Sequence, residues 1–100
     1  MLLVNSTIRF TKKDKVYSAS KIRPMVNFGN GMLFSFNLLH SPETLEPNTD
    51  YNATFEFFSI NEEAYTCIKD LLINSKDVVV QESSKNIIGL ATLHDYDYIS

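Results

Sequence analysis

The segment at residues 45–57 constrains the fold most strongly, because a turn signal runs directly into strict alternation. Turns select Pro, Asn and Asp, and residues 47–50 contain all three. From there every second residue is apolar: Tyr51, Ala53, Phe55 and Phe57. Side chains of a strand point alternately to opposite faces. The pattern therefore predicts a strand that follows the turn and buries Phe55 in a core.

Comparable β-forming segments recur along the chain. They lie at 3–10, 32–39, 77–82 and 87–93. On the first of them, one face is predicted to carry Val4, Ser6, Ile8 and Phe10. Short turns separate the segments at 11–15, 29–31 and 83–86. Short strands at regular spacing are typical of barrels, so we expect residues 1–100 to form one domain, a six-stranded antiparallel closed barrel.

The pattern changes after Phe58, and one helix is predicted at about 61–74. Ser59 with Glu62 three residues later matches a capping box, in which each side chain satisfies a free backbone N–H. Apolar residues then recur at helical spacing: Ala64, Ile68, Leu71 and Leu72. The tail at 94–100 alternates acid and aromatic residues, and we expect either a frayed edge or a partner-facing segment.

Size and composition favour one globular domain in the cytoplasm. The chain has 100 residues, of which 44% are apolar and 12% aromatic. No apolar run approaches the roughly 20 residues that span a membrane. The first residues show neither the basic segment nor the long apolar run of a secretory signal. Cys67 is the single cysteine, which favours a reducing compartment. We therefore predict a cytoplasmic protein that does not contact a membrane.

The net charge of −3 conceals an uneven distribution. Residues 1–30 carry six bases and one acid, whereas residues 31–100 carry three bases and eleven acids. Lys12, Lys13 and Lys15 stand together in a predicted turn, so they form a local positive cluster. With Arg23 they are candidate contacts for a phosphate backbone, although the acidic remainder of the chain repels one.

No pattern for catalysis or metal binding is present in the sequence. A phosphate-binding G-x-x-x-x-G-K-[ST] loop is missing, which excludes that class of nucleotide hydrolase. His40, Cys67 and His94 lack the paired spacing of a zinc site. Adjacent strand residues point to opposite faces, so we interpret His94 beside Asp95 as a surface histidine, and Cys67 as a buried, unreactive thiol. We expect no enzymatic activity, no metal and no cofactor.

Three short motifs follow one another along the chain: Arg23-Pro24, then Leu45, Pro47 and Asp50, then Glu82, Lys85, Ile88 and Gly89. In this order and spacing they resemble the third domain of elongation factor Tu. The resemblance covers residues from about 7 to 93 and implies the six-stranded barrel that ends translational GTPases, here without its GTPase domain. It also implies that the turn at 47–50 serves the fold. Departures are Asn48 in place of the usual Gly, Ser83-Ser84 at the last hairpin tip, and the helix.

The family's domain works by docking, so the resemblance implies a non-catalytic protein-binding module. The candidate partner-binding residues are acids and tyrosines of the tail and the first helical turn: Asp95, Tyr96, Asp97, Tyr98, Glu62 and Glu63. An acidic module of this size also suits an immunity or antitoxin-type inhibitor of a basic toxin. The family's barrel contacts the backbone of transfer RNA, which leaves a translation-associated RNA-binding accessory open. Its contacts would be Lys12, Lys13, Lys15 and Arg23.

Overall fold

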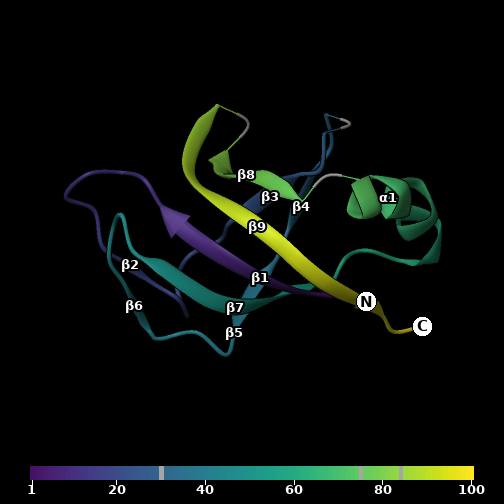
Figure 1. The fold of residues 1–100 in the computed structure, drawn as a ribbon, viewed down its shortest axis with the longest axis horizontal. Helices are drawn as coiled ribbons and strands as arrows, with labels where there is room; N and C mark the ends of the chain where they lie inside the picture. The colour runs from purple at the N-terminus through teal and green to yellow at the C-terminus, as the bar shows by residue number, and fades with distance from the viewer. Residues whose placement is uncertain (30, 75, 84) are drawn as a thin grey trace.

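The computed structural model describes residues 1–29, 31–74, 76–83 and 85–100, which form a strongly curved sheet with one helix (Figure 1). Their elements are β1 (Leu2–Phe10), β2 (Tyr17–Ser18), β3 (Met25–Asn27), β4 (Leu33–Ser35), β5 (Asn37–Leu39), β6 (Thr44–Leu45), β7 (Asp50–Phe57), α1 (Glu62–Asn74), β8 (Asp77–Ser83) and β9 (Asn86–Tyr98). Seven strands form one antiparallel sheet in the order β4-β3-β8-β9-β1-β7-β5, and β2 pairs with β6. The predicted β fold with one helix is confirmed.

The sheet nearly closes into a barrel because its two edge strands are consecutive in the chain. β4 pairs with β3, and β5 pairs with β7, yet only Phe36 separates β4 from β5. Phe36 is 1% exposed, and its N–H donates to the carbonyl of Pro24 at 3.1 Å. The predicted strand at 32–39 is therefore broken in two. The prediction of six strands is wrong, because this break gives the main sheet seven within the described residues.

Aromatic rings fill the centre of the barrel. The five most deeply buried phenylalanines are Phe10, Phe28, Phe36, Phe55 and Phe57. Phe36 stacks on Phe55 with ring centroids 4.3 Å apart, and it also lies 5.3 Å from Phe57. The inward orientation predicted for Phe55 is confirmed, since this side chain is 0% exposed. The inward face predicted for the first strand is likewise buried on β1: Val4, Ser6, Ile8 and Phe10.

The turn at 47–50 ties the start of β7 to the end of β1. Asn48 has a φ of 57°, a left-handed conformation that Asn adopts at modest cost, and its N–H donates to the carbonyl of Phe10 at 2.8 Å. Asp50 accepts from Nε of Arg9 at 2.7 Å, so its carboxylate binds the neighbouring strand. The predicted turn is confirmed, and its contacts fix the register of β7 against β1.

Gly89 allows β9 and β1 to approach closely. A Cβ atom at this position would lie 2.6 Å from the carbonyl oxygen of Arg9 and 3.3 Å from the Cα atom of Phe10. Both contacts are to backbone, which cannot rotate away as a flexible side chain does. Gly29 and Gly31 have φ values of 105° and 82°, as a turn requires. Two other residues of the predicted turns, Asn30 and Ser84, lie outside the described residues.

Helix α1 covers one end of the barrel, beside the start of β1 and the end of β9 (Figure 1). Ile68 and Leu72 are buried, which confirms the predicted apolar face. The helix begins at Glu62, so the N-cap is Asn61, whose Oδ1 accepts from the N–H of Ala64 at 2.9 Å. The capping box predicted from Ser59 and Glu62 is therefore wrong. No helix in the described ranges has the length and apolar character to cross a membrane.

Candidate functional site

Most of the predicted tail at 94–100 is the last part of a strand. β9 continues to Tyr98, and Leu2 of β1 lies opposite this residue. In the same register, Asp97 of β9 pairs with Leu3 of β1, and Tyr96 pairs with Val4. The expectation of a frayed edge is therefore wrong, because β1 supplies backbone hydrogen bonds almost to the end of the segment.

Tyrosines and aspartates of this segment lie on opposite sides of β9. Tyr96 and Tyr98 are half-buried, whereas Asp95 and Asp97 are exposed. Tyr65 of α1 stacks on Tyr98 with ring centroids 4.5 Å apart and planes 8° from parallel. Burial raises the pKa of Tyr65, and the neighbouring Tyr96 and Asp97 raise it further. The tyrosines therefore hold α1 on the sheet, and only the aspartates face solvent freely.

Glu62 and Glu63 are exposed in the first turn of α1, where the helix dipole favours negative charge. Glu62 precedes Tyr65 by three residues and so lies on the same side of the helix, toward the end of β9. Within the described residues, an ion pair joins Arg9 to Asp50, whereas neither glutamate nor Asp97 has a cationic partner. Three carboxylates thus share one end of the molecule.

Exposed apolar side chains accompany these carboxylates. Leu2 of β1 lies opposite Phe57 on one side and Tyr98 on the other, so the next residues, Phe58 and Ile99, leave the sheet at the same end. Phe58 is 57% exposed and Ile99 is 45% exposed. The surface that these residues form is called the acidic end below: Phe58, Glu62, Glu63, Asp97 and Ile99.

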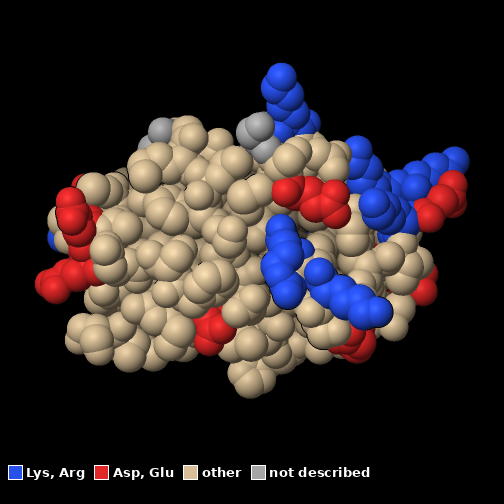
Figure 2. Space-filling view, turned by 180° about the vertical axis from the view of Figure 1, so that it is seen from behind, with Lys and Arg blue, Asp and Glu red and all other residues tan. Residues whose placement is uncertain are grey.

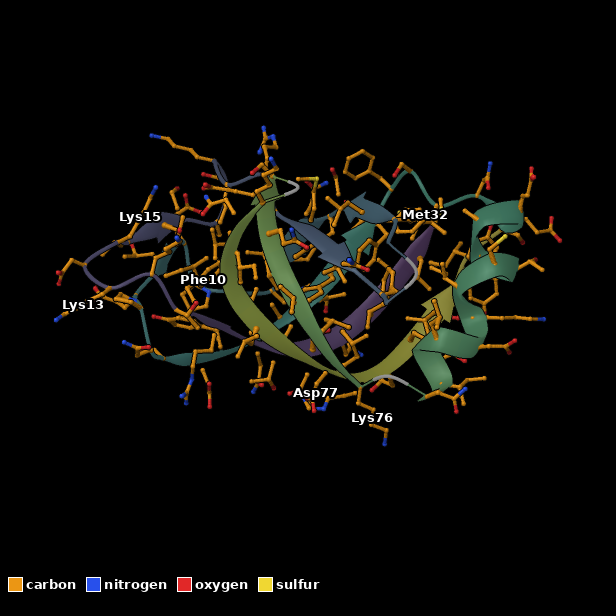
Figure 3. The ribbon with its side chains drawn as sticks, turned by 90° about the horizontal axis from the view of Figure 1, so that it is seen from above. Phe10, Lys13, Lys15, Met32, Lys76 and Asp77 are labelled. Carbon is orange, nitrogen blue, oxygen red and sulfur yellow. The ribbon has the colours of Figure 1, made fainter. Side chains whose placement is uncertain are left out.

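The lysines of the connection between β1 and β2 lie at the opposite end, whereas Lys69 belongs to α1 itself. Lys13 and Lys15 lie far from α1 in the connection between β1 and β2 (Figure 3). In Figure 2 most lysine and arginine side chains of this face lie over the half away from α1, where several acidic side chains stand among them, and further acidic side chains lie at the α1 end. Positive charge is therefore concentrated in one half of this face, although that half is of mixed sign.

The four residues predicted to contact RNA do not all line one site. Lys15 and Arg23 line an open hollow of about 460 Å³, whereas Lys12 and Lys13 are outside its lining. Sequence reasoning did not assign the other residues of this lining to a site, and among them are Tyr17, Lys21 and Glu82. Lys21 was visible as a nearby base, but Glu82 comes from β8 and is brought here only by the fold. The site is called the basic hollow below and consists of Lys15, Tyr17, Lys21, Arg23 and Glu82.

Tyr17 is the buried polar residue of the basic hollow. It is 6% exposed, and its ring centroid lies 4.9 Å from that of Phe10 and 5.5 Å from Nζ of Lys15. Its hydroxyl is buried and has no hydrogen-bond partner among the described residues. Burial raises the pKa of Tyr17, and the charge of Glu82 raises it further, so the hydroxyl stays a proton donor at neutral pH.

Glu43 fixes the loop that carries Lys21 and Arg23. Its carboxylate accepts hydrogen bonds from the hydroxyls of Ser18 and Ser20, and from the N–H of Ser20 at 3.2 Å. These bonds lower the pKa of Glu43, the bond from Ser18 most strongly, and the charge of Lys21 adds to the effect. The bases of the hollow therefore project from a loop with defined geometry.

His94 lies at a β-bulge, which changes the predicted geometry. Asn5 pairs with Asp95 and Ser6 pairs with Leu93, so His94 is the extra residue on β9. His94 and Asp95 consequently line the same hollow of about 350 Å³, and the prediction that they face opposite sides is wrong. They bind different partners: Nε2 of His94 lies 2.7 Å from Oγ1 of Thr7, and Asp95 accepts from Asn5 at 2.7 Å.

The Thr7 and His94 pair does not form an activated nucleophile. The hydroxyl of Thr7 donates its single proton to Oδ1 of Asn52 at 2.9 Å, so Nε2 of His94 is the donor in their contact. A base that activates threonine must instead accept its proton. This arrangement links β9, β1 and β7 across the outer face of the sheet, and His94 is exposed there as predicted.

Cys67 and His40 are the remaining candidate groups. Cys67 is exposed, so its prediction as a buried thiol is wrong; it precedes Ile68 by one residue and therefore points away from the buried face. His40 is exposed, has a φ of 60°, and lines the same hollow as His94 and Asp95. No group of three or more His, Cys, Asp or Glu side chains suited to a metal ion occurs in the part of the chain that the structure describes.

No protein-family model matches this chain, and no curated protein or solved structure is significantly similar to it. The resemblance to the third domain of elongation factor Tu therefore stays a prediction that rests on its three motifs.

Proposed function

We propose that this protein is a non-catalytic module that binds a basic protein partner at its acidic end. The observation that supports this most is the grouping of Glu62, Glu63 and Asp97 without a cationic partner among the described residues. Unneutralised carboxylates steer a basic surface toward them and select against acidic partners. Phe58 and Ile99 offer apolar area beside the charges, the combination that protein interfaces use.

The three carboxylates of the acidic end lie on regular structure, which favours binding. Glu62 and Glu63 belong to a capped helix, and Asp97 belongs to a strand paired with β1. Stacking of Tyr65 on Tyr98 joins the helix to that strand. A surface fixed in this way loses little conformational entropy when a partner docks.

The absence of an activated nucleophile at Thr7 and His94 supports a binding role over a catalytic one. We propose that the chain acts in the cytoplasm as a free-standing barrel similar to the third domain of elongation factor Tu, and that it works by binding a partner. An immunity or antitoxin-type inhibitor is the special case in which the basic partner is a toxin. A toxin gene beside the gene for this chain would favour that case, and translation genes would favour an accessory of translation.

Affinity capture with charge variants tests the proposal. We would compare the full chain with the double variant Glu62→Gln, Glu63→Gln, and identify the captured proteins at low and moderate salt. A matched control is Asp14→Asn, Glu46→Gln, which removes the same charge from exposed positions outside the acidic end.

We expect the capture experiment to yield a basic protein that binds both the unmodified chain and the control variant. The helix variant should bind it about 10-fold or more weakly, since two interfacial charges are lost. Equal capture by the helix variant, or a loss confined to the control, would place the interface elsewhere.

A further inference from the structure

We propose that the basic hollow binds a small ligand through a phosphate group. Lys15, Lys21 and Arg23 line this hollow, and the buried hydroxyl of Tyr17 belongs to a residue of the same lining. Its volume of about 460 Å³ falls within the range of small-molecule sites and leaves room for the molecule that carries the phosphate. The site is separate from the acidic end and does not depend on the function proposed there.

The charge of the hollow matches a phosphate group. Its three bases and one acid, Glu82, leave a net charge of +2 in the lining. A phosphate monoester carries about −1.5 to −2 at neutral pH, whereas a carboxylate carries only −1. Glu82 already accepts from Nδ2 of Asn86 at 3.0 Å, and none of the three bases has an ion pair among the described residues. The guanidinium of Arg23 adds the planar donor geometry that phosphate oxygens fit.

The hydroxyl of Tyr17 is the second observation that points to a ligand. A buried hydroxyl without a partner destabilises a fold, and phenylalanine would fill the same space without that cost. Tyr17 and Glu82 both line the hollow, and the charge of Glu82 raises the pKa of Tyr17. The hydroxyl is covered in this structure, so the proposed contact with a phosphate oxygen requires side chains of the hollow to move aside.

Lys12 and Lys13 distinguish a site from a general positive surface. Both are exposed in the connection that also carries Lys15, but neither lines the hollow. A long polyanion that follows the positive end would contact them as readily as Lys15. A phosphate group held in the hollow would contact Lys15 but neither Lys12 nor Lys13.

Nuclear magnetic resonance titration of the full chain with inorganic phosphate tests this inference, with sodium chloride at the same ionic strength as the reference. We expect saturable shifts of the backbone amides at 15–23 and 82. Lys21→Gln and Arg23→Gln should each weaken binding about fivefold or more, because each removes a charge-assisted hydrogen bond. Lys13→Gln is the matched control and should leave the affinity unchanged.

Tyr17→Phe separates a ligand-binding role from a structural one. Without phosphate, this variant should be at least as thermally stable as the unmodified chain, since it loses an unpartnered hydroxyl. With phosphate, its affinity should fall about threefold or more. If Tyr17→Phe lowers the thermal stability and leaves the phosphate affinity unchanged, the hydroxyl serves the fold, and its proposed role in phosphate binding is overturned.

Two further outcomes would overturn the proposal. Shifts that rise linearly with phosphate, or that Lys13→Gln reduces as much as Lys21→Gln, would show general ion screening. A short single-stranded RNA provides the last comparison: if it binds while inorganic phosphate does not, and Lys13→Gln weakens it equally, the surface recognises a polyanion rather than one phosphate group.

Discussion

Replacing Phe55 by alanine should be among the most destabilising single changes in this protein. The side chain is 0% exposed, stacks on Phe36 at 4.3 Å, and meets Phe57 edge-on at 6.4 Å. Truncation of a buried phenylalanine costs about 3–5 kcal/mol. Two aromatic contacts are lost as well, and a pair of this kind contributes about 0.5–1.5 kcal/mol. We therefore expect Phe55→Ala to lower the free energy of unfolding by about 4–5 kcal/mol, the upper half of the range for a buried phenylalanine.

Phe58→Ala is the matched control, because Phe58 is 57% exposed and only three residues away. Its free energy of unfolding should change by less than about 1 kcal/mol. Urea denaturation of both variants, followed by circular dichroism, gives the comparison. If Phe55→Ala does not fold, Phe55→Leu should still fold and lose about 1–2 kcal/mol. Equal effects at Phe55 and Phe58 would refute the assigned inward face of β7.

Three other changes test separate parts of the structure. Gly89→Ala should lower the free energy of unfolding by about 2 kcal/mol, because its Cβ atom would meet the backbone of Arg9 at 2.6 Å; unchanged denaturation would disprove this close contact. Tyr17→Phe should raise the stability of the free protein by about 1 kcal/mol in the same assay, and a clear loss would mean that the hydroxyl has a partner. The hydrogen bonds that lower the pKa of Glu43 stabilise the fold fully above the carboxyl's unfolded pKa of about 4.3, and this stabilisation is lost as the pH falls through the lower folded value. Glu43→Gln should therefore flatten the stability profile below that pH, and an identical acid profile would contradict it.

The strands that the sequence predicted best are those with strict alternation. Along β1 and the second half of β7, buried side chains alternate with half-buried or exposed ones, as in a sheet with one face on a core. The break at Phe36 had no such signal, because aromatic and aliphatic residues continue through it. Phe36 leaves the strand because two edges of one sheet must meet there, and that requirement is a property of the whole barrel.

The errors at the binding surfaces also come from long-range contacts. The acidic and aromatic composition of 94–98 is typical of an exposed tail, and only pairing with β1 makes it a strand. The bulge at His94 depends on the register of that same pairing. In the basic hollow, Lys15 and Arg23 were predicted as phosphate contacts, but Glu82 joins them from β8, much later in the sequence. A local pattern carries no information about such a neighbour.

The salt dependence of partner affinity tests the central claim most directly. With a purified partner from the capture experiment, affinity for the full chain and for Glu62→Gln, Glu63→Gln would be measured by calorimetry across a range of salt concentrations. We predict that the affinity of the full chain falls as salt rises, and that the variant binds more weakly with a shallower salt dependence, because its acidic end attracts the partner less. The same affinity and the same slope for both proteins would contradict binding at the acidic end.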